Sequence, residues 1–317
     1  MSQGAPPGCS VFSCRAMATQ FDIVLWGDAF GRLQAAATEA MGEIEAAERL
    51  LSAFDPASEI AQLNARETQG PLRIDLRVLR LLERCVHYTE QTGGAFDVSV
   101  GPLMRVWGFR GEPEGDWPSA RAATGMDKLD LDLDAGTVAF ASDAVRLDLG
   151  AVGKGYAVDA AMDVLRECGL KGAMVHGGRS TAAAMGATPD GGPWQALVRD
   201  PSPGAKVPMA RVELAEGAMS VSAPHGRTAG GLGHVMNPRT GKPAAASLIA
   251  AVAHPSAEAT DAYSTALLVL GREGLRRLGG VEGLSALWAP RLAAGGRAAR
   301  TLGPAFRLSP DPESPVS

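Results

Sequence analysis

The 317-residue chain contains little cysteine, few aromatic residues and no cluster of basic charge. Its four cysteines include no CxxC pair, so no disulfide framework or zinc site of the usual spacing is predicted, and reduced thiols are expected. The net charge is -5 and no block of lysine and arginine is present, so the electrostatic signature of nucleic-acid binding is missing. The chain is therefore expected to act on a small molecule or a protein, with no nucleic-acid partner.

Long apolar runs are missing as well. No stretch of about 18 apolar residues predicts a membrane span. Residues 1–30 lack the basic start and the run of about 7 to 15 apolar residues that a secretory signal needs. The chain as given is therefore expected to be cytoplasmic, without a membrane span.

Several hydrolase motifs are absent too, among them the G-x-S-x-G turn and the H-E-x-x-H pair, so serine and zinc hydrolases have little support. What is present is an ordinary globular composition, with 46% hydrophobic and 21% charged residues, which allows a large core. No fixed-period repeat indicates a solenoid or propeller. We expect residues 1–14 to be a loose leader, residues 15–303 to be one folded unit and residues 304–317 to be a flexible tail.

Hydrophobic periodicity predicts alternating strands and helices, and hence an α/β fold, between the leader and the tail. A strand at 21–26 precedes a helix at 31–51, and a second amphipathic helix covers 77–92 before a Gly-Gly stop. Residues 129–149 alternate as a β-hairpin does, with its second β-run extending to 145–149. The remaining expected elements are a loop from 93, a glycine turn and helix within 147–168, a strand ending near 176, strands at 194–198, 210–214 and 248–253, and a helix at about 256–270.

The last of these helices carries a carboxylate and a hydroxyl four residues apart. Asp261 and Thr265 therefore share one face of the helix, with Ser264 beside them. Oxygen ligands of this kind suit a hard cation such as Mg²⁺, which keeps positions open for phosphate oxygens. The structural alternative is that Asp261 stabilises the first helical turn while Thr265 bonds back to a helix carbonyl. Taken alone, this segment favours the structural alternative.

A glycine-rich turn occupies residues 147–159, LDLGAVGKGYAVD. Glycines after a strand let the backbone approach a ligand, and the N-terminus of the following helix offers N–H groups to phosphate. The spacing of Gly150, Gly153 and Gly155 fits neither G-x-G-x-x-G nor a Walker A loop. Within this segment alone, Lys154 is best explained as a solvated lysine of the turn.

Residues 233–244, GHVMNPRTGKPA, combine turn signals with two functional candidates. Arg239 is a forked donor suited to a carboxylate or phosphate, and His234 can move protons near neutral pH. A single histidine at a strand end is more often structural.

Residues 92–109, TGGAFDVSVGPLMRVWGF, form the fourth candidate segment. Phe96 and Trp107 could cover an aromatic ligand, and Asp97 could accept hydrogen bonds from it. The local alternative is a packed loop with an aromatic plug, which this segment alone favours.

Six segments, in this order along the chain, resemble the FAD:protein FMN transferase family, the ApbE-type flavin transferases. Any one of them is only moderately specific, whereas six in the right order are strong. They are RAMATQFDI (15–23), LLSAFDPASEIAQLN (50–64), GGAFDVSVGPLMRVWGF (93–109), LDLGAVGKGYAVD (147–159), HVMNPRTGKP (234–243) and ATDAYSTALLVLG (259–271).

The resemblance implies an α/β (α+β) fold of the tunnelling-fold-like type, with mixed sheets, packed helices and residues 15–303 as a single catalytic unit. It also implies that FAD lies in a cleft with Mg²⁺ on its pyrophosphate. FMN would pass to a Thr or Ser hydroxyl of an acceptor flavoprotein, and AMP would be released. By matching motif positions it implies FAD contacts from Met17, Phe54, Ala95, Phe96, Asp97 and Ala151, Mg²⁺ ligation by Asp261, Thr265 and a backbone carbonyl near Gly153, and His234 as the base.

The chain departs from the family pattern in several places. The usual Gly-Gly-Asp is Gly177-Gly178-Arg179 here, which replaces a carboxylate with a cation. The usual Thr-Ser-Gly, aromatic, Arg segment is replaced at 221–227, Met-Gly-Thr is Met-Ala-Thr at 17–19, and a lipoprotein leader is missing. Two alternatives therefore stay open: an FAD pyrophosphatase that gives FMN and AMP, and a flavin-binding protein without catalysis.

Overall fold

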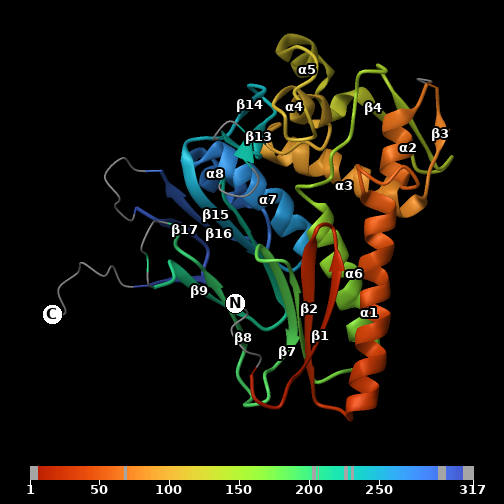
Figure 1. Cartoon of the computed structure of the whole chain (residues 1–317). Coiled ribbons are helices and arrows are strands. Elements are labelled where there is room, and N and C mark those ends of the chain that lie inside the picture. The colour runs from red at the N-terminus through yellow and green to blue at the C-terminus, as the bar shows by residue number, and fades with distance from the viewer. Residues whose placement is uncertain are drawn as a thin grey trace.

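An eight-stranded antiparallel sheet organises the computed structural model, which describes residues 6–67, 70–201, 205, 207–224, 228–229, 232–291 and 298–309 (Figure 1). Each strand of this sheet is antiparallel to its neighbours. In spatial order the strands are β1 (Ser10–Ala16), β2 (Thr19–Trp26), β6 (Gly172–Gly177), β7 (Thr181–Gly186), β10 (Gly217–Ser222), β15 (Ser247–His254), β16 (Ser285–Pro290) and β17 (Arg300–Leu302).

Helices α1 (Phe30–Leu51), α6 (Gly153–Glu167) and α7 (Ala257–Leu270) cover one face of this sheet (Figure 1). Their buried sides are rich in alanine, so the helices lie close to the sheet and to one another. Gly155 in α6 marks one such close approach, because a Cβ there would overlap the carbonyl oxygen of Ala257 in α7.

A three-stranded sheet lies on the opposite face of the large sheet. Its order is β18 (Phe306–Leu308), β9 (Ala210–Leu214) and β8 (Trp194–Val198), with β8 at one edge. Its buried residues pack on alanine and methionine side chains of β7, β10, β15 and β16. The molecule therefore has three layers in this half, helices, large sheet and small sheet.

The remaining elements close the end of the molecule where α3 lies (Figure 1). A small sheet of order β3-β5-β4 stands beside α2 and α3, and α3 is tied to α7 by an ion pair with a buried carboxylate, described below. These elements are α2 (Glu59–Ala65), β3 (Leu72–Arg73), α3 (Leu76–Thr92), α4 (Gly101–Val106), α5 (Trp117–Ala123), η1 (Met126–Lys128), β4 (Leu129–Asp132), β5 (Thr137–Phe140), β11 (Thr228–Ala229), β12 (Leu232–Gly233), β13 (Met236–Asn237), β14 (Lys242–Pro243), α8 (Arg272–Arg277) and η2 (Leu278–Gly280).

The mixed α/β architecture predicted from the sequence is confirmed, and the four predicted helices lie within a few residues of α1, α3, α6 and α7. The hairpin is confirmed as β4 and β5, but 145–149 is not a strand. In that segment a single bridge joins Val100 to Arg146. The loop expected from 93 contains the short helix α4, which begins at Gly101 with Pro102 in its first turn.

Two boundary predictions are wrong. Residues 10–14 belong to strand β1, which pairs with β2 from Ser10 to Ala16, so the loose leader cannot extend to residue 14. Residues 306–308 form β18, paired with β9, so the tail cannot begin at 304. β1 pairs with β2, its neighbour along the chain, and β18 pairs with the distant β9. Both strands keep exposed residues, so their pairing rather than their hydrophobicity defines them. The ends of the expected leader and tail, 1–5 and 310–317, lie outside the described residues.

None of the helices in the described part of the chain is long and apolar enough to cross a bilayer.

The crossing of α6 and α7 yields a test of stability. We expect Gly155→Ala to lower the free energy of unfolding by about 2 kcal/mol, because the new methyl group must displace backbone of α7. Gly42→Ala in α1 is the matched control: its Cβ would meet open space, and the gain in helix propensity should raise stability by up to about 1 kcal/mol. Urea unfolding of both variants measures the difference. Equal stability of the two would contradict the tight crossing.

Candidate functional site

All ten residues to which the family resemblance assigns a role line one cavity, of about 2550 Å³. They come from six segments far apart in the chain, which the fold brings around the N-terminus of α6 and the side of α7 that carries Asp261 and Thr265. They are Met17, Phe54, Ala95, Phe96, Asp97, Ala151, Gly153, His234, Asp261 and Thr265. Their shared location is a finding, while the role of each residue remains a prediction.

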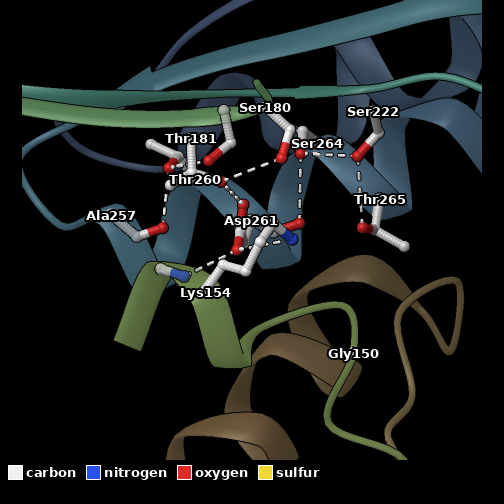
Figure 2. A network of polar contacts seen from close by, with 12 residues as sticks. Gly150, Lys154, Ser180, Thr181, Ser222, Ala257, Thr260, Asp261, Ser264 and Thr265 are labelled. Atoms are coloured by element: carbon white, nitrogen blue, oxygen red, sulfur yellow. Dashed lines mark hydrogen bonds and ion pairs between the residues drawn. The ribbon is translucent and has the colours of Figure 1, made fainter. Parts of the chain in front are cut away.

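Asp261 is the most strongly held of these residues. Its side chain is buried, and Oδ1 accepts a hydrogen bond of 2.7 Å from the Thr181 hydroxyl at the start of β7 (Figure 2). Oδ2 accepts the backbone N–H of Gly155 at 2.8 Å and lies 3.8 Å from the Lys154 ammonium. One carboxylate thus joins α7, the N-terminus of α6 and the large sheet.

These contacts revise two of the local interpretations. Asp261 does not stabilise the first turn of its helix, because α7 begins at Ala257 and is capped by Ser256. Lys154 is not simply a solvated lysine of the turn, because it lines the cavity and pairs with Asp261. The pairing joins residues 107 positions apart, so no local signal in the glycine turn could have revealed it.

Thr265 lies one turn after Asp261 on the same side of α7, as the spacing predicts (Figure 2). Its hydroxyl is 3.4 Å from that of Ser222 at the end of β10, and Ser222 also bonds Ser264 at 2.9 Å. The described residues contain no group of three or more His, Cys, Asp or Glu side chains placed to hold a metal. A cation here would be held by one carboxylate, by hydroxyl and carbonyl oxygens and by phosphate oxygens of a bound substrate. This is a hard donor set that fits Mg²⁺.

Two acidic side chains, partly buried Asp159 and buried Glu258, hold α7 in place. Asp159 of α6 accepts hydrogen bonds from the Ser256 hydroxyl and from the N–H groups of Ala257 and Glu258, at 2.7 to 2.9 Å. Glu258 is held in turn by a forked pair of bonds from Arg84 of α3, at 2.7 and 2.6 Å. The helix that carries Asp261 and Thr265 is therefore fixed at its N-terminus from two sides.

A second ion pair lines the cavity beside the glycine turn. Arg110 donates to both oxygens of Asp148, at 2.6 and 2.8 Å, and both side chains are mostly buried. The Arg110 guanidinium also lies 4.9 Å from the centre of the Phe54 ring, which is 64% exposed. An exposed aromatic ring at a cavity suits stacking on a planar ligand. The sequence interpretation missed Arg110, although it directly follows the 93–109 segment.

The loop after α3 places Phe96 and Asp97 in the cavity wall, but not Trp107. Phe96 lines the cavity but is 1% exposed and packs edge-on against Tyr88 in the core. Asp97 accepts bonds from the backbone and hydroxyl of Ser99, and burial raises the pKa of its carboxyl despite them. Trp107 does not lie among the described cavity residues. Its indole N–H donates to the Gly241 carbonyl, so the expected role in covering a ligand is not supported.

Met17 and His234 come from two loops at the cavity wall. Met17 and Ala18 both have positive φ, 51° and 57°, in the two-residue turn between β1 and β2, and the Met17 N–H donates to Glu48 at 2.6 Å. This hairpin turn favours glycine, the residue that the family resemblance places at position 18. His234 is half-buried between β12 and β13. Of the departing segment at 221–227, residues 225–227 lie outside the described residues.

Asp159 gives a pH-dependent test of how α7 is anchored. Burial raises the pKa of its carboxyl from 3.8 to about 6, against the lowering effect of the helix N–H donors. The folded protein then binds more protons than the unfolded chain between these values, so this group's contribution to stability falls as pH rises. Compared with Asp159→Asn, which cannot titrate, the wild-type free energy of unfolding should fall between pH 4 and 6 and level off above. Urea unfolding of both proteins across pH measures this. If the stability of the wild type relative to Asp159→Asn instead grows with pH, the N–H donors outweigh burial and lower the pKa of Asp159.

The chain is similar to known proteins over most of its length. The sequence pattern of the ApbE family matches residues 17–288. The chain is 30% identical over 279 residues to the FAD:protein FMN transferase of Treponema pallidum, covering 80% of this chain and 77% of that protein. It is 26% identical over 299 residues to the enzyme of the same name from Salmonella typhimurium, covering 89% and 84%.

Solved structures agree on the fold. The flavin transferase ApbE from Vibrio cholerae superposes with a TM-score of 0.81 at 23% identity, over 94% of this chain and 98% of that one. The ApbE protein from Thermotoga maritima superposes with a TM-score of 0.82 at 22% identity, over 93% and 97%. The sequence match over most of the chain, together with this shared fold, shows that the chain belongs to the ApbE family.

Proposed function

We propose that this chain transfers FMN from FAD to the hydroxyl of a Thr or Ser in an acceptor flavoprotein, with release of AMP and with Mg²⁺ as cofactor. Its relatives named FAD:protein FMN transferase support the reaction. The observation that carries the proposal is the shared cavity, in which Asp261 and Thr265 face the same space as the candidate FAD contacts. Because these residues span positions 17 to 265, we propose one catalytic unit, which with β1 and β18 reaches from residue 10 to residue 308.

In the proposed reaction the acceptor oxygen forms a bond to the phosphorus that carries riboflavin. The bond from this phosphorus to the bridging oxygen of the pyrophosphate breaks, and AMP leaves with that oxygen. The acceptor hydroxyl loses its proton, for which His234 is the candidate base because it lines the same cavity. No oxidation or reduction takes place.

The chain's own groups suit the two ends of FAD. The exposed Phe54 ring, held beside Arg110, offers a flat surface to an aromatic ring system. The N-terminus of α6 and Lys154 offer positive charge to the pyrophosphate. Asp261, Thr265 and the carbonyl of Gly153 would hold Mg²⁺, which when bound would neutralise negative charge on the phosphates. Thr181 and Gly155 fix the orientation of the Asp261 carboxylate.

The direct test is incubation of the protein with FAD, Mg²⁺ and candidate acceptor flavoproteins, with AMP release and acceptor mass both followed. Transfer predicts AMP and an acceptor heavier by one FMN. AMP with free FMN and an unchanged acceptor would identify an FAD pyrophosphatase instead. FAD binding without any AMP would identify a flavin-binding protein.

Asp261→Asn tests the metal assignment. The amide keeps the size of the side chain but removes its charge, leaving only neutral oxygens for a hard cation, so AMP release should fall at least about 100-fold. Asp163→Asn on the exposed side of α6 is the control and should retain full activity. Urea unfolding of both variants separates lost chemistry from lost stability, since Asp261 also tethers α6. Full activity of Asp261→Asn at low Mg²⁺ would remove Asp261 from the site.

His234→Ala tests the base. If His234 takes the proton, the transfer rate per bound FAD should fall about 100-fold while FAD affinity stays nearly unchanged. A purely structural histidine would instead reduce stability and FAD affinity together. The control is His87→Ala, on an exposed position of α3 outside the cavity residues. FAD titration and single-turnover transfer on the same preparations decide; a rate loss of less than about tenfold contradicts the role.

A further inference from the structure

The small sheet leaves part of the large sheet uncovered. It packs over β7, β10, β15 and β16, and beyond them it reaches Val24, Met174 and the ends of β1 and β2 at Cys9 and Trp26. Farther toward β1, Ser13, Asp22 and His176 stand in one row across β1, β2 and β6 and line the cavity. The cavity thus extends from the Asp261 centre over an open face of the large sheet.

Strand β8 forms the second wall of this extension. One of its edges pairs with β9, from Trp194 opposite Leu214 to Val198 opposite Ala210. Its other edge pairs with no strand among the described residues, and Trp194, Gln195, Ala196 and Leu197 line the cavity. An edge strand presents unpaired N–H and C=O groups at alternate residues. The open edge of β8 and the open sheet face therefore bound a groove, which we call the β8 groove.

The β8 groove leads to the proposed reaction centre. The Trp194 indole donates to the Met185 carbonyl, so β8 begins over the last residues of β7. The residues that follow β8, Arg199 to Pro201, line the same cavity as Ser180 to Ala182 at the other end of β7. Thr181, the first residue of β7, holds Asp261.

Volume and charge indicate what the β8 groove accepts. The cavity of about 2550 Å³ is well above the roughly 300–1,000 Å³ of a typical small-molecule site, so space for a second substrate remains. Arg179 and Arg199 line it with exposed side chains and have no carboxylate partner within the described structure. The acids Asp22, Asp190 and Asp200 line it as well, so acidic side chains of a bound segment are expected only beside Arg179 and Arg199. An extended segment with acidic residues at those two places fits both features.

We propose that the acceptor flavoprotein binds by adding an extended segment to the open edge of β8, with acidic side chains near Arg179 and Arg199. Main-chain bonds to β8 supply affinity, and the side chains select the acceptor. The segment delivers its Thr or Ser hydroxyl at the Thr181 end of the β8 groove. The inference rests on the proposed function, since it concerns the second substrate of that reaction.

Synthetic nine-residue peptides test strand addition. Each carries a central Thr and flanking Asp residues, and two versions carry N-methyl groups on either the odd or the even residues. A strand added to β8 uses the N–H groups of alternate residues, so one methylated version should bind at least about tenfold more weakly than the other. Titration into the protein with FAD and Mg²⁺ measures this. Equal binding of the two methylated versions overturns the proposal. So does the absence of binding by the unmethylated peptide at about 1 mM, a concentration that reveals a binding free energy of about 4 kcal/mol.

Charge reversal tests the two arginines. The double variant Arg179→Glu, Arg199→Glu should bind the Asp peptide at least about tenfold more weakly than the wild type does. It should bind the same peptide with Lys in place of Asp more tightly than the Asp peptide. Arg166→Glu, on α6 and outside the cavity residues, should keep the wild-type preference. An unchanged preference in the double variant overturns the charge assignment.

FAD affinity and AMP release in the presence of a candidate acceptor flavoprotein are measured on the same samples. A wild-type protein that neither binds FAD nor releases AMP would contradict the proposed function itself. FAD turnover without any difference between the odd and even methylated peptides would contradict strand addition alone.

Discussion

The close crossing of α6 and α7 is the constraint on which the rest of the site depends. Gly155 has no side chain where α7 begins, and its N–H reaches the Asp261 carboxylate at 2.8 Å. A larger residue would separate the helices and with them the glycine turn from the oxygen pair on α7. The N-terminus of α6 and the candidate metal ligands of α7 are thus held together by close helix packing and by the bond from the Gly155 N–H to Asp261.

Buried charge completes this arrangement at the cost of desolvation. Asp159, Glu258 and Asp261 all meet the α6–α7 crossing, and each accepts hydrogen bonds from groups that a helix terminus or an arginine supplies. Such groups are expensive to bury unless they are fully paired. Their partners come from α3, α6 and β7, so the correct position of α7 is specified by several elements at once. This rigidity suits a reaction in which phosphorus and hydroxyl must meet in line.

The two faces of the large sheet serve different purposes. The helix-covered face is filled by apolar side chains and alanine-rich helices, which supply the core. The other face is covered only in part, so its polar residues on β1, β2 and β6 remain at the wall of the cavity. An incompletely covered sheet provides space that a fully packed sandwich would not, and the unpaired edge of β8 borders that space.

The sequence by itself determined the features that depend on local spacing. Helical periodicity located α1, α3, α6 and α7, the interval of four put Asp261 and Thr265 on one face, and six ordered segments indicated the family. Only the tertiary structure decided what stands opposite those faces. The pairs Lys154–Asp261 and Arg110–Asp148, strand β1 and the open edge of β8 all depend on contacts between distant or weakly hydrophobic segments. Spacing along the chain fixes the direction of a side chain within its own helix or strand, whereas its partner is chosen by the packing of the whole fold.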